Sequence, residues 1–225
     1  MGLRGPKPKG KVKIVWSPDF AYAIGLIVTD GNVSPDGRHI TFVSNDLEQI
    51  KNFQTALGIT LPMSYAVSGY TAKKSPRVQF SDVHFWKFLV SIGVMPNKSK
   101  TIQEVSIPRK YFMDFLRGCM DGDGSFYSYF DPRWKSSFMF YLIFASASRE
   151  HIDWLRKEIG RHCGVVGHIT SDSKKNIYQL KYAKQETLKI LKNMYYSTSV
   201  ICLSRKRSKI EKALKIAGFE QNMPR

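Results

Sequence analysis

Cysteine, acidic residues and long apolar runs are all scarce in this sequence. Only three of its 225 residues are cysteines, and no two of them have the spacing of a metal site, so a disulfide framework and a cysteine zinc site are excluded. An odd cysteine count is typical of a reducing compartment. The most apolar stretch near the N-terminus, residues 21–28, is too short to span a membrane, and no secretion signal is visible. We therefore expect an intracellular protein of the cytoplasm or an organelle.

The shortage of acidic residues leaves a large positive charge. There are 35 Lys and Arg against 18 Asp and Glu, a net charge of +17. Residues 1–110 hold 15 basic and 7 acidic residues, and residues 111–225 hold 20 and 11, so the two parts carry +8 and +9. An excess spread this evenly predicts a long polyanion that touches both halves. The Gly-, Pro- and Lys-rich start of the chain predicts a basic arm over residues 1–16.

One pattern occurs twice: an apolar helical stretch that runs directly into Asp-Gly. The copies are residues 20–31 and 115–124, and each has a glycine five residues before its final aspartate, Gly25 and Gly118. Small residues on one face of a helix allow a second backbone to approach closely. We therefore expect the two helices to pack on each other.

The two final aspartates, Asp30 and Asp123, are expected at helix C-terminal ends, where the helix dipole disfavours negative charge. If the helices pack in parallel, the carboxylates also face each other, which requires a cation between them. Carboxylate oxygens suit Mg²⁺. Gly31 and Gly124 follow these aspartates and fit the left-handed position after a helix. A buried helix that simply ends at an Asp-Gly turn is the alternative for either copy alone.

The rest of the chain repeats as well. In each half the pattern predicts helix, hairpin, helix, hairpin, helix, which is an α+β fold with one antiparallel sheet per half. The middle helices are expected at residues 47–57, ending at Gly58, and at residues 150–159, ending at Gly160. The first hairpin of the second half is about nine residues longer, around residues 129–136, because the motif aspartates are 93 apart while later elements are 102 apart. We expect the first half over residues 17–95, a linker over residues 96–110 and the second half over residues 111–225.

These motifs resemble those of the LAGLIDADG homing endonucleases, in the single-chain form with two copies. Against the nine-letter pattern, residues 23–31 keep the Gly, Leu, Ile, final Asp and final Gly, and residues 116–124 keep the Leu, Gly, both Asp and final Gly. Val28 replaces the first Asp, which is not a metal ligand in the family. The resemblance covers nearly the whole chain. It implies two pseudosymmetric αββαββα halves joined at the motif helices, with the sheets forming a saddle over double-stranded DNA.

The activity that the resemblance implies is a Mg²⁺-dependent double-strand break, with 3′ overhangs, in a long asymmetric DNA target. A monomer is expected, because the two halves lie in one chain. The implied metal ligands are the carboxylates of Asp30 and Asp123 and the carbonyls of Thr29 and Gly122. A basic residue of each half is expected to assist: Lys98, with Lys100 as its rival, and Lys206, with Arg205 as its rival. Asn45 and Ser148, just before the middle helices, are expected to position solvent.

Several predicted strands alternate polar and apolar residues, and Arg, Lys and Gln are the side chains that read base edges in a major groove. RNA maturation during intron splicing, DNA binding without cleavage, and a small RNA-binding protein with basic strands are the alternative functions. The expected base-reading residues are Arg38, His39, Thr41, Arg77, Gln79, Arg133, Lys135, Gln179 and Lys181. The expected phosphate contacts are Lys73, Lys74, Lys174 and Lys175.

Overall fold

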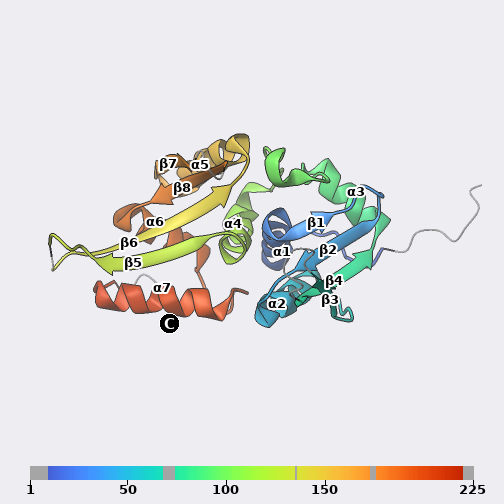
Figure 1. Cartoon of the computed structure of the whole chain (residues 1–225), viewed down its shortest axis with the longest axis horizontal. Helices are drawn as coiled ribbons and strands as arrows, with labels where there is room; N and C mark the ends of the chain where they lie inside the picture. The colour runs from blue at the N-terminus through green and yellow to red at the C-terminus, as the bar shows by residue number, and fades with distance from the viewer. Residues whose placement is uncertain (1–9, 68–73, 135, 173–175, 220–225) are drawn as a thin grey trace, which may run out of the picture.

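The computed structural model describes residues 10–67, 74–134, 136–172 and 176–219. Two similar halves lie side by side, with one helix of each half at the centre (Figure 1). The first half consists of α1 (Pro18–Thr29), β1 (Gly31–Val33), β2 (His39–Val43), α2 (Leu47–Leu57), β3 (Ser64–Val67), β4 (Lys74–Ser81) and α3 (Val83–Ser91). The second half consists of α4 (Phe112–Asp121), β5 (Ser125–Phe130), β6 (Phe138–Ser146), α5 (Arg149–Cys163), β7 (His168–Asp172), β8 (Ile177–Tyr182), α6 (Lys184–Met194) and α7 (Ser204–Ile216). The connection holds two short 3-10 turns, Lys98–Lys100 and Arg109–Tyr111.

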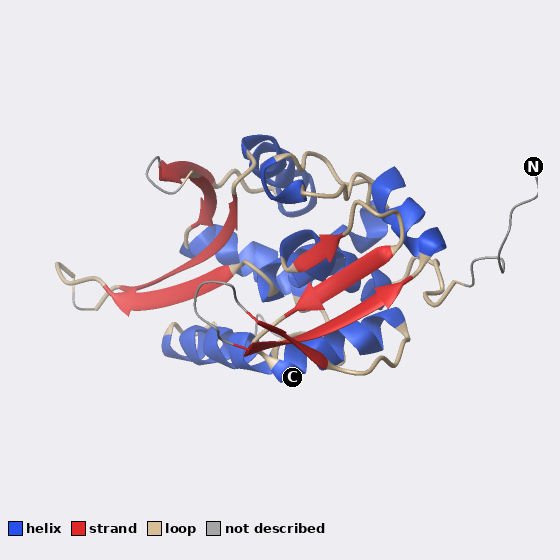
Figure 2. Ribbon diagram, turned by 45° about the vertical axis from the view of Figure 1, so that its right-hand side comes forward, coloured by secondary structure: helices blue, strands red, loops and turns tan. Residues whose placement is uncertain are grey.

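Each half has one four-stranded antiparallel sheet, in the order β1-β2-β4-β3 or β5-β6-β8-β7. The two orders correspond strand for strand, which confirms the predicted α+β fold with αββαββα halves. Helices cover one face of each sheet (Figure 2). Ile40 and Phe42 of β2 and Phe140 of β6 point to that face and are fully buried. The opposite faces remain open to solvent. In the described part of the chain, no helix is both long and apolar enough to span a membrane.

The central contact is the close packing of α1 against α4. A Cβ atom added to Gly25 would lie 2.2 Å from the carbonyl oxygen of Phe115, and one added to Gly118 would lie 2.1 Å from that of Tyr22. Real Cβ atoms do not approach a backbone oxygen so closely, so only glycine fits at either position. The predicted close approach of the two motif helices is therefore present, backbone against backbone.

The final glycines of the two motifs are needed for a different reason than the sequence analysis gave. Neither Gly31 nor Gly124 is left-handed, so that prediction was wrong. At each one the chain folds back over the last turn of its own helix. A Cβ at Gly31 would lie 2.7 Å from Cα of Ile27, and one at Gly124 would lie 2.5 Å from Cα of Met120. The lack of a side chain, and not positive φ, is what these positions require.

The predicted end of the middle helix is confirmed in the first half and wrong in the second. Helix α2 covers the expected residues and ends at Gly58, which is left-handed with φ of 63°. Helix α5 runs through Gly160 and ends at Gly164, which has φ of 63°. The helix continues because Cys163, one turn after Gly160, still packs against the core. An apolar face that persists past a glycine outweighs the helix-ending tendency of that glycine.

The helix contact gives a direct stability test. We expect Gly118→Ala to lower the free energy of unfolding by more than about 3 kcal/mol, because the added methyl group displaces α1 from α4. Gly160→Ala is the matched control within a helix, since its Cβ meets only the Val165 carbonyl oxygen, at 3.0 Å. The control should stay within about 1 kcal/mol of the wild type in urea unfolding. Equal effects of the two substitutions would contradict the packing account.

Candidate active site

The C-terminal ends of α1 and α4 meet. Asp30 is the C-cap residue of α1, and Asp123 lies two residues after the end of α4. A Cβ at Gly122 would lie 2.0 Å from Oγ1 of Thr29 and 2.9 Å from Oδ2 of Asp30, so the carboxylate of one motif lies against the backbone of the other. The structure thus brings together the two aspartates that the sequence separates by 93 residues.

The two carboxylates raise each other's free energy when both are charged. Burial, and then the charge of Asp123, raise the pKa of Asp30 to about 6. Burial also raises the pKa of Asp123 above its ordinary value. Neighbouring carboxylates with raised pKa values and no direct ion pair are the arrangement that a cation stabilises. Among the described residues, no Lys or Arg forms a salt bridge with either aspartate.

Two lysines lie at the same helix ends. Lys98 donates from Nζ to the Gly31 carbonyl at 2.5 Å, and Lys206 donates to the Gly124 carbonyl at 2.8 Å. Gly31 and Gly124 are the same position in the two motifs, so the lysines are pseudosymmetric partners. Lys206 also lies 2.7–2.9 Å from the carbonyl oxygens of Met120, Asp121 and Gly122. A cation among the last carbonyls of a helix is favoured by the helix dipole.

The environment of these lysines weakens their proton affinity. Burial lowers the pKa of Lys206 to about 8, and it also lowers the pKa of Lys98, while the nearby aspartates oppose both shifts. Their sequence rivals have other contacts: Lys100 is exposed, and Arg205 lines the cavity beside Asp30 but forms its ion pair with Asp46, at 2.7 Å. Lys98 and Lys206, and not the rivals, are the basic residues that contact the motif ends.

Sequence reasoning missed Gln49. Its Nε2 donates to Oδ2 of Asp30 at 3.0 Å and to the carbonyl of Asp121 at 3.1 Å, while its Oε1 accepts from the Ser44 hydroxyl at 2.7 Å. It thereby holds the Asp30 carboxylate and the end of α4 at the same time. It lies three residues after the N-cap residue of α2, Asp46.

His151 is the counterpart of Gln49, at the same 102-residue offset that relates the later elements of the two halves. Its Nδ1 donates to the Gln103 carbonyl at 2.7 Å, and burial lowers the pKa of His151 to about 4, so the ring is neutral. Applying the offset to polar residues one turn inside the middle helices would have found both positions. Ser148, in contrast, is buried, accepts a hydrogen bond from the His151 amide and donates to the Ile102 carbonyl. It caps α5, and the expectation that it positions solvent was wrong.

Two cavities open beside the helix ends. One, of about 660 Å³, is lined by Asp30, Ser44, Gln49 and Arg205. The other, of about 290 Å³, is lined by Asp123, Lys98 and His151. Asn45 lines the first cavity, and its side-chain oxygen accepts from the Ser75 hydroxyl at 2.9 Å. Each carboxylate therefore lines its own cavity, and the two cavities differ in composition.

The expected base-reading residues of the strands lie on the open faces of the sheets. Cross-strand pairing puts Thr41 beside Gln79, on the face that Arg77 shares, and puts Lys181 and Gln179 on the matching face of the second sheet. His39 is on the first of these faces and contacts Asp36. Arg38 and Arg133 lie at the hairpin turns, with Arg133 3.1 Å from Asp131. Lys74 opens β4 and is not in a turn as expected. The expected contacts Lys73, Lys135, Lys174 and Lys175 fall outside the described residues.

The residues at the helix ends fit a divalent cation of the Mg²⁺ type. Within the described ranges, no group of three or more His, Cys, Asp or Glu side chains converges, so a closed site of protein ligands is not formed there. Mg²⁺ commonly takes one or two carboxylates and completes its shell with water and phosphate oxygens. Asp30 and Asp123 supply those carboxylates. The neighbouring carbonyls of Thr29 and Gly122, which the family resemblance implies as further ligands, remain a prediction.

No protein-family model and no curated protein matches the sequence. Solved structures do match. The homing endonuclease I-WcaI bound to its DNA recognition sequence superposes with a TM-score of 0.63 at 13% identity, over 92% of this chain and 95% of that one. I-DmoI in complex with DNA and Mn gives 0.52 at 12%, over 80% and 97%. This chain has the LAGLIDADG fold.

A further match extends the LAGLIDADG fold beyond the homing endonucleases. Full-length DUF199/WhiA from Thermatoga maritima gives a TM-score of 0.56 at 16% identity, covering 90% of this chain and 62% of that one. The chain thus spans less than two thirds of that protein. The same LAGLIDADG fold occurs in proteins of both descriptions, so the fold alone does not decide whether this chain cleaves DNA.

The raised pKa of Asp30 predicts that this carboxylate destabilises the metal-free protein. Between about pH 4 and pH 6 the folded state binds more protons than the unfolded state, so stability falls as the pH rises through that window. We expect Asp30→Asn to raise the free energy of unfolding by about 1 kcal/mol at pH 8, after allowance for the partial exposure of Asp30. At pH 4 the substitution should leave the free energy of unfolding unchanged. Urea unfolding at the two pH values measures the difference.

The control for this experiment is Asp36→Asn. Backbone amides and His39 hold the pKa of Asp36 below its ordinary range, so this change should destabilise the protein at pH 8. Added Mg²⁺ should stabilise the wild type more than Asp30→Asn. A variant less stable than the wild type at pH 8 without metal would contradict the account of the site.

Proposed function

We propose that this protein is a site-specific endonuclease that makes a metal-dependent double-strand break in a long, asymmetric DNA target. The observation that carries the proposal is the meeting of Asp30 and Asp123 at two abutting helix ends, where each carboxylate lines its own cavity. Two lysines lie at the same ends, Lys98 buried and Lys206 half-buried. Packing holds together two carboxylates that repel each other. A contact that served stability alone would not be expected to keep such charges together. The fold of I-WcaI and I-DmoI, both solved with DNA, supports the same reading.

In this proposal Asp30 and Asp123 hold divalent cations, with Mg²⁺ the expected one. When bound, such a cation supplies charge stabilisation at phosphate oxygens and lowers the pKa of water. Gln49 orients the Asp30 carboxylate, because its amide spans from that carboxylate to the Asp121 carbonyl. Lys98 and Lys206 place positive charge at the helix ends, where a phosphate that gains negative charge would lie. The helix contact keeps these groups at fixed separation.

Double-stranded DNA is the proposed partner. The net charge of +17 is shared by both halves, and the open sheet faces carry Arg77, Gln79, Gln179 and Lys181 on either side of the carboxylates. One chain supplies both halves, so a monomer suffices for both strands. Because the two halves differ in sequence, the preferred target should be asymmetric, and the break is expected to leave 3′ overhangs.

A non-cleaving DNA-binding protein is the second candidate. It is favoured by the Lys206 ammonium, which lies within 2.9 Å of the Gly122 carbonyl, one of the expected metal ligands. A lysine can thus satisfy the end of α4 without metal. Cleavage tests therefore decide between the two candidates.

The first test is cleavage of a randomised duplex DNA library with Mg²⁺. We expect the wild type to enrich one family of cut sequences, and Asp30→Asn or Asp123→Asn to abolish double-strand cleavage while retaining measurable binding to the selected duplex. EDTA should have the same effect as these substitutions. Binding without any cut product in the wild type would support the second candidate, and tighter binding to RNA than to duplex DNA would favour maturase function.

Lys206 can be tested against a neighbour on the same helix. Lys206→Ala should reduce the single-turnover cleavage rate at least about 100-fold, since it removes the half-buried positive charge at the motif end. Lys209→Ala, one turn further along α7 and exposed, serves as the control and should alter the rate less than about threefold. Similar rates for the two variants would rule out a special role for Lys206.

A further inference from the structure

An apolar groove lies beside α2 in the first half. It has a volume of about 600 Å³, and its lining includes Leu47, Ile50 and Lys51 of α2, Ile59, and Met63 just before β3. Leu47 is 58% exposed and Met63 is 44% exposed. Helix α2 and strand β3 lie next to each other at one edge of the molecule (Figure 1). We call this feature the α2 groove. Among the described residues that line it, none is acidic.

The apolar surface continues from the α2 groove along β3. Tyr65 pairs with Pro76 of β4, and Val67 pairs with Lys74. Strand alternation puts these residues on the same side of the sheet as Val78, which is fully buried beneath the helices. Tyr65 is nevertheless 55% exposed and Val67 62%, so the helices leave this part of the sheet uncovered. The surface therefore lies on the side opposite the face proposed for DNA.

Strand β3 is also an edge strand. It is the last in the order β1-β2-β4-β3, so within the described residues no further strand lies on its outer side. An edge strand presents unpaired N–H and C=O groups to which another strand can bond. Natural proteins often protect such an edge with charged residues or proline, but β3 has the sequence Ser-Tyr-Ala-Val. Its edge is therefore open to the addition of a strand.

The second half shows that the fold does not require apolar residues at this surface. Leu47 corresponds, at the 102-residue offset, to Arg149 of α5, which forms an ion pair with Asp153 at 2.7 Å. Tyr65 corresponds to Ser171 of β7, because their partners on the neighbouring strands are also 102 residues apart. Both equivalent positions are polar. The exposed apolar side chains of the first half are thus a property of that half, and a contiguous patch of this kind is typical of a binding surface.

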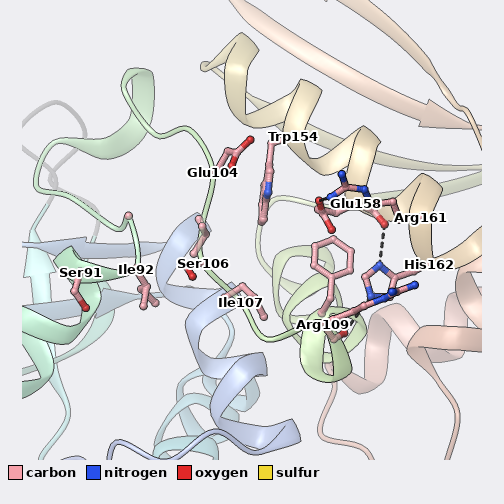
Figure 3. A pocket seen from close by; sticks show the side chains of 13 residues that line it. Ser91, Ile92, Glu104, Ser106, Ile107, Arg109, Trp154, Glu158, Arg161 and His162 are labelled. Carbon is pink, nitrogen blue, oxygen red and sulfur yellow. Dashed lines mark hydrogen bonds and ion pairs between the residues drawn. The ribbon is translucent and has the colours of Figure 1, made fainter.

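A larger cavity provides a useful contrast. It has a volume of about 770 Å³ and lies where the connection between the halves passes α4 and α5 (Figure 3). Its lining carries both signs of charge, with Glu104 and Glu158 against Arg109 and Arg161, and Arg161 is paired with Glu158 at 2.5 Å. Such a lining favours neither an acidic nor a basic ligand. The α2 groove, in contrast, carries charge of one sign only.

The charge around the α2 groove indicates the class of its occupant. Lys51 lines the groove, and Lys74 lies beside Val67 on the same side of the sheet. A second copy of this chain would bring a further charge of +17 to the contact, which opposes self-association. A nucleic acid needs partners for its phosphates along its length, and the apolar lining does not supply them. A peptide with acidic and apolar side chains satisfies the lysines, the apolar lining and the open strand edge together.

We propose that the α2 groove and β3 dock an extended acidic segment of another protein, which adds to β3 as a fifth strand of the first sheet. In strand addition the main-chain hydrogen bonds supply affinity, and alternate side chains supply specificity. Apolar side chains of the segment contact Leu47, Met63 and Tyr65, and its carboxylates lie near Lys51. Leu47 also lines the cavity of Asp30, so the docked segment ends beside the candidate active site. The inference does not depend on DNA cleavage.

The test selects peptides from a randomised display library on the full wild-type chain. We expect the enriched peptides to alternate apolar residues with Asp or Glu. The double variant Leu47→Arg with Tyr65→Ser gives these two positions the residue types of the second half, and it should bind an enriched peptide at least about tenfold more weakly in fluorescence anisotropy. Lys51→Glu should weaken binding at least about threefold at low salt, and less at high salt.

Main-chain pairing has a separate readout on the wild-type protein. Methylation of the peptide nitrogens at the alternate positions that face β3 should abolish binding, because it removes the donors of the new ladder. Methylation at the intervening positions should have a much smaller effect. Bound peptide should also slow hydrogen exchange of those β3 amides that point away from β4.

Val166→Ser is the matched control for the double variant. Val166 is an apolar residue of the second half that is 64% exposed, and its replacement should leave peptide affinity unchanged. Thermal unfolding of each variant accompanies the binding measurement. If the double variant is unfolded, the methylated peptides decide the question on the wild type alone.

Four results would overturn the inference. The first is a library that enriches no peptide on the wild type, or the same peptides with equal affinity on the folded double variant. The second is enrichment of basic peptides, and the third is weaker binding of duplex DNA or RNA by the double variant than by the wild type. The fourth is a dimer of the wild type that the double variant loses, which would make a second copy the occupant. None of these results bears on cleavage, so the proposed function stands or fails separately.

Discussion

The rest of the structure depends on the backbone contact between α1 and α4. Gly25 and Gly118 let the two helices approach until carbonyl oxygens occupy the space that a Cβ would need. That approach brings the helix ends together, and with them Asp30 and Asp123. Each half has its own sheet, but neither half alone contains a complete site. Two glycines therefore couple the fold of each half to the chemistry at the interface between them.

Packing brings the two carboxylates of the site together although they repel each other. Burial and mutual repulsion raise the pKa of Asp30, and both carboxylates lie at helix ends that already carry partial negative charge. The compensation comes from side chains distant in sequence: Lys98 and Lys206 bond to equivalent glycine carbonyls, and Gln49 bridges Asp30 to the end of α4. Packing energy from the cores of two halves keeps unfavourable charges in place, as is common at functional sites.

Much of this arrangement could be predicted from the sequence. The doubled motif indicates the repeat and the pairing of the two helices, and the difference between the 93- and 102-residue offsets indicates the longer β5–β6 hairpin. The reason for Gly31 and Gly124 could not, since it depends on a chain reversal over Ile27 and Met120 that no local pattern reveals. The end of α5 was misplaced because the core contact of Cys163 outweighs Gly160. Gln49 escaped notice because an isolated glutamine in an amphipathic helix carries no signal until its neighbour in space is known.

The connections at the start of α7 have a consequence for how the protein is made. The Leu203 amide donates to Asp121, the Ser204 amide to Glu48 of α2, and Lys206 to the end of α4, so this short segment links both halves at the interface. It follows every other described element except α7 itself. During translation both sheets leave the ribosome before Lys206 does. A nascent chain can thus fold both halves while the acidic groups have Lys98 but still lack Lys206, and the centre is completed only as this last helix docks.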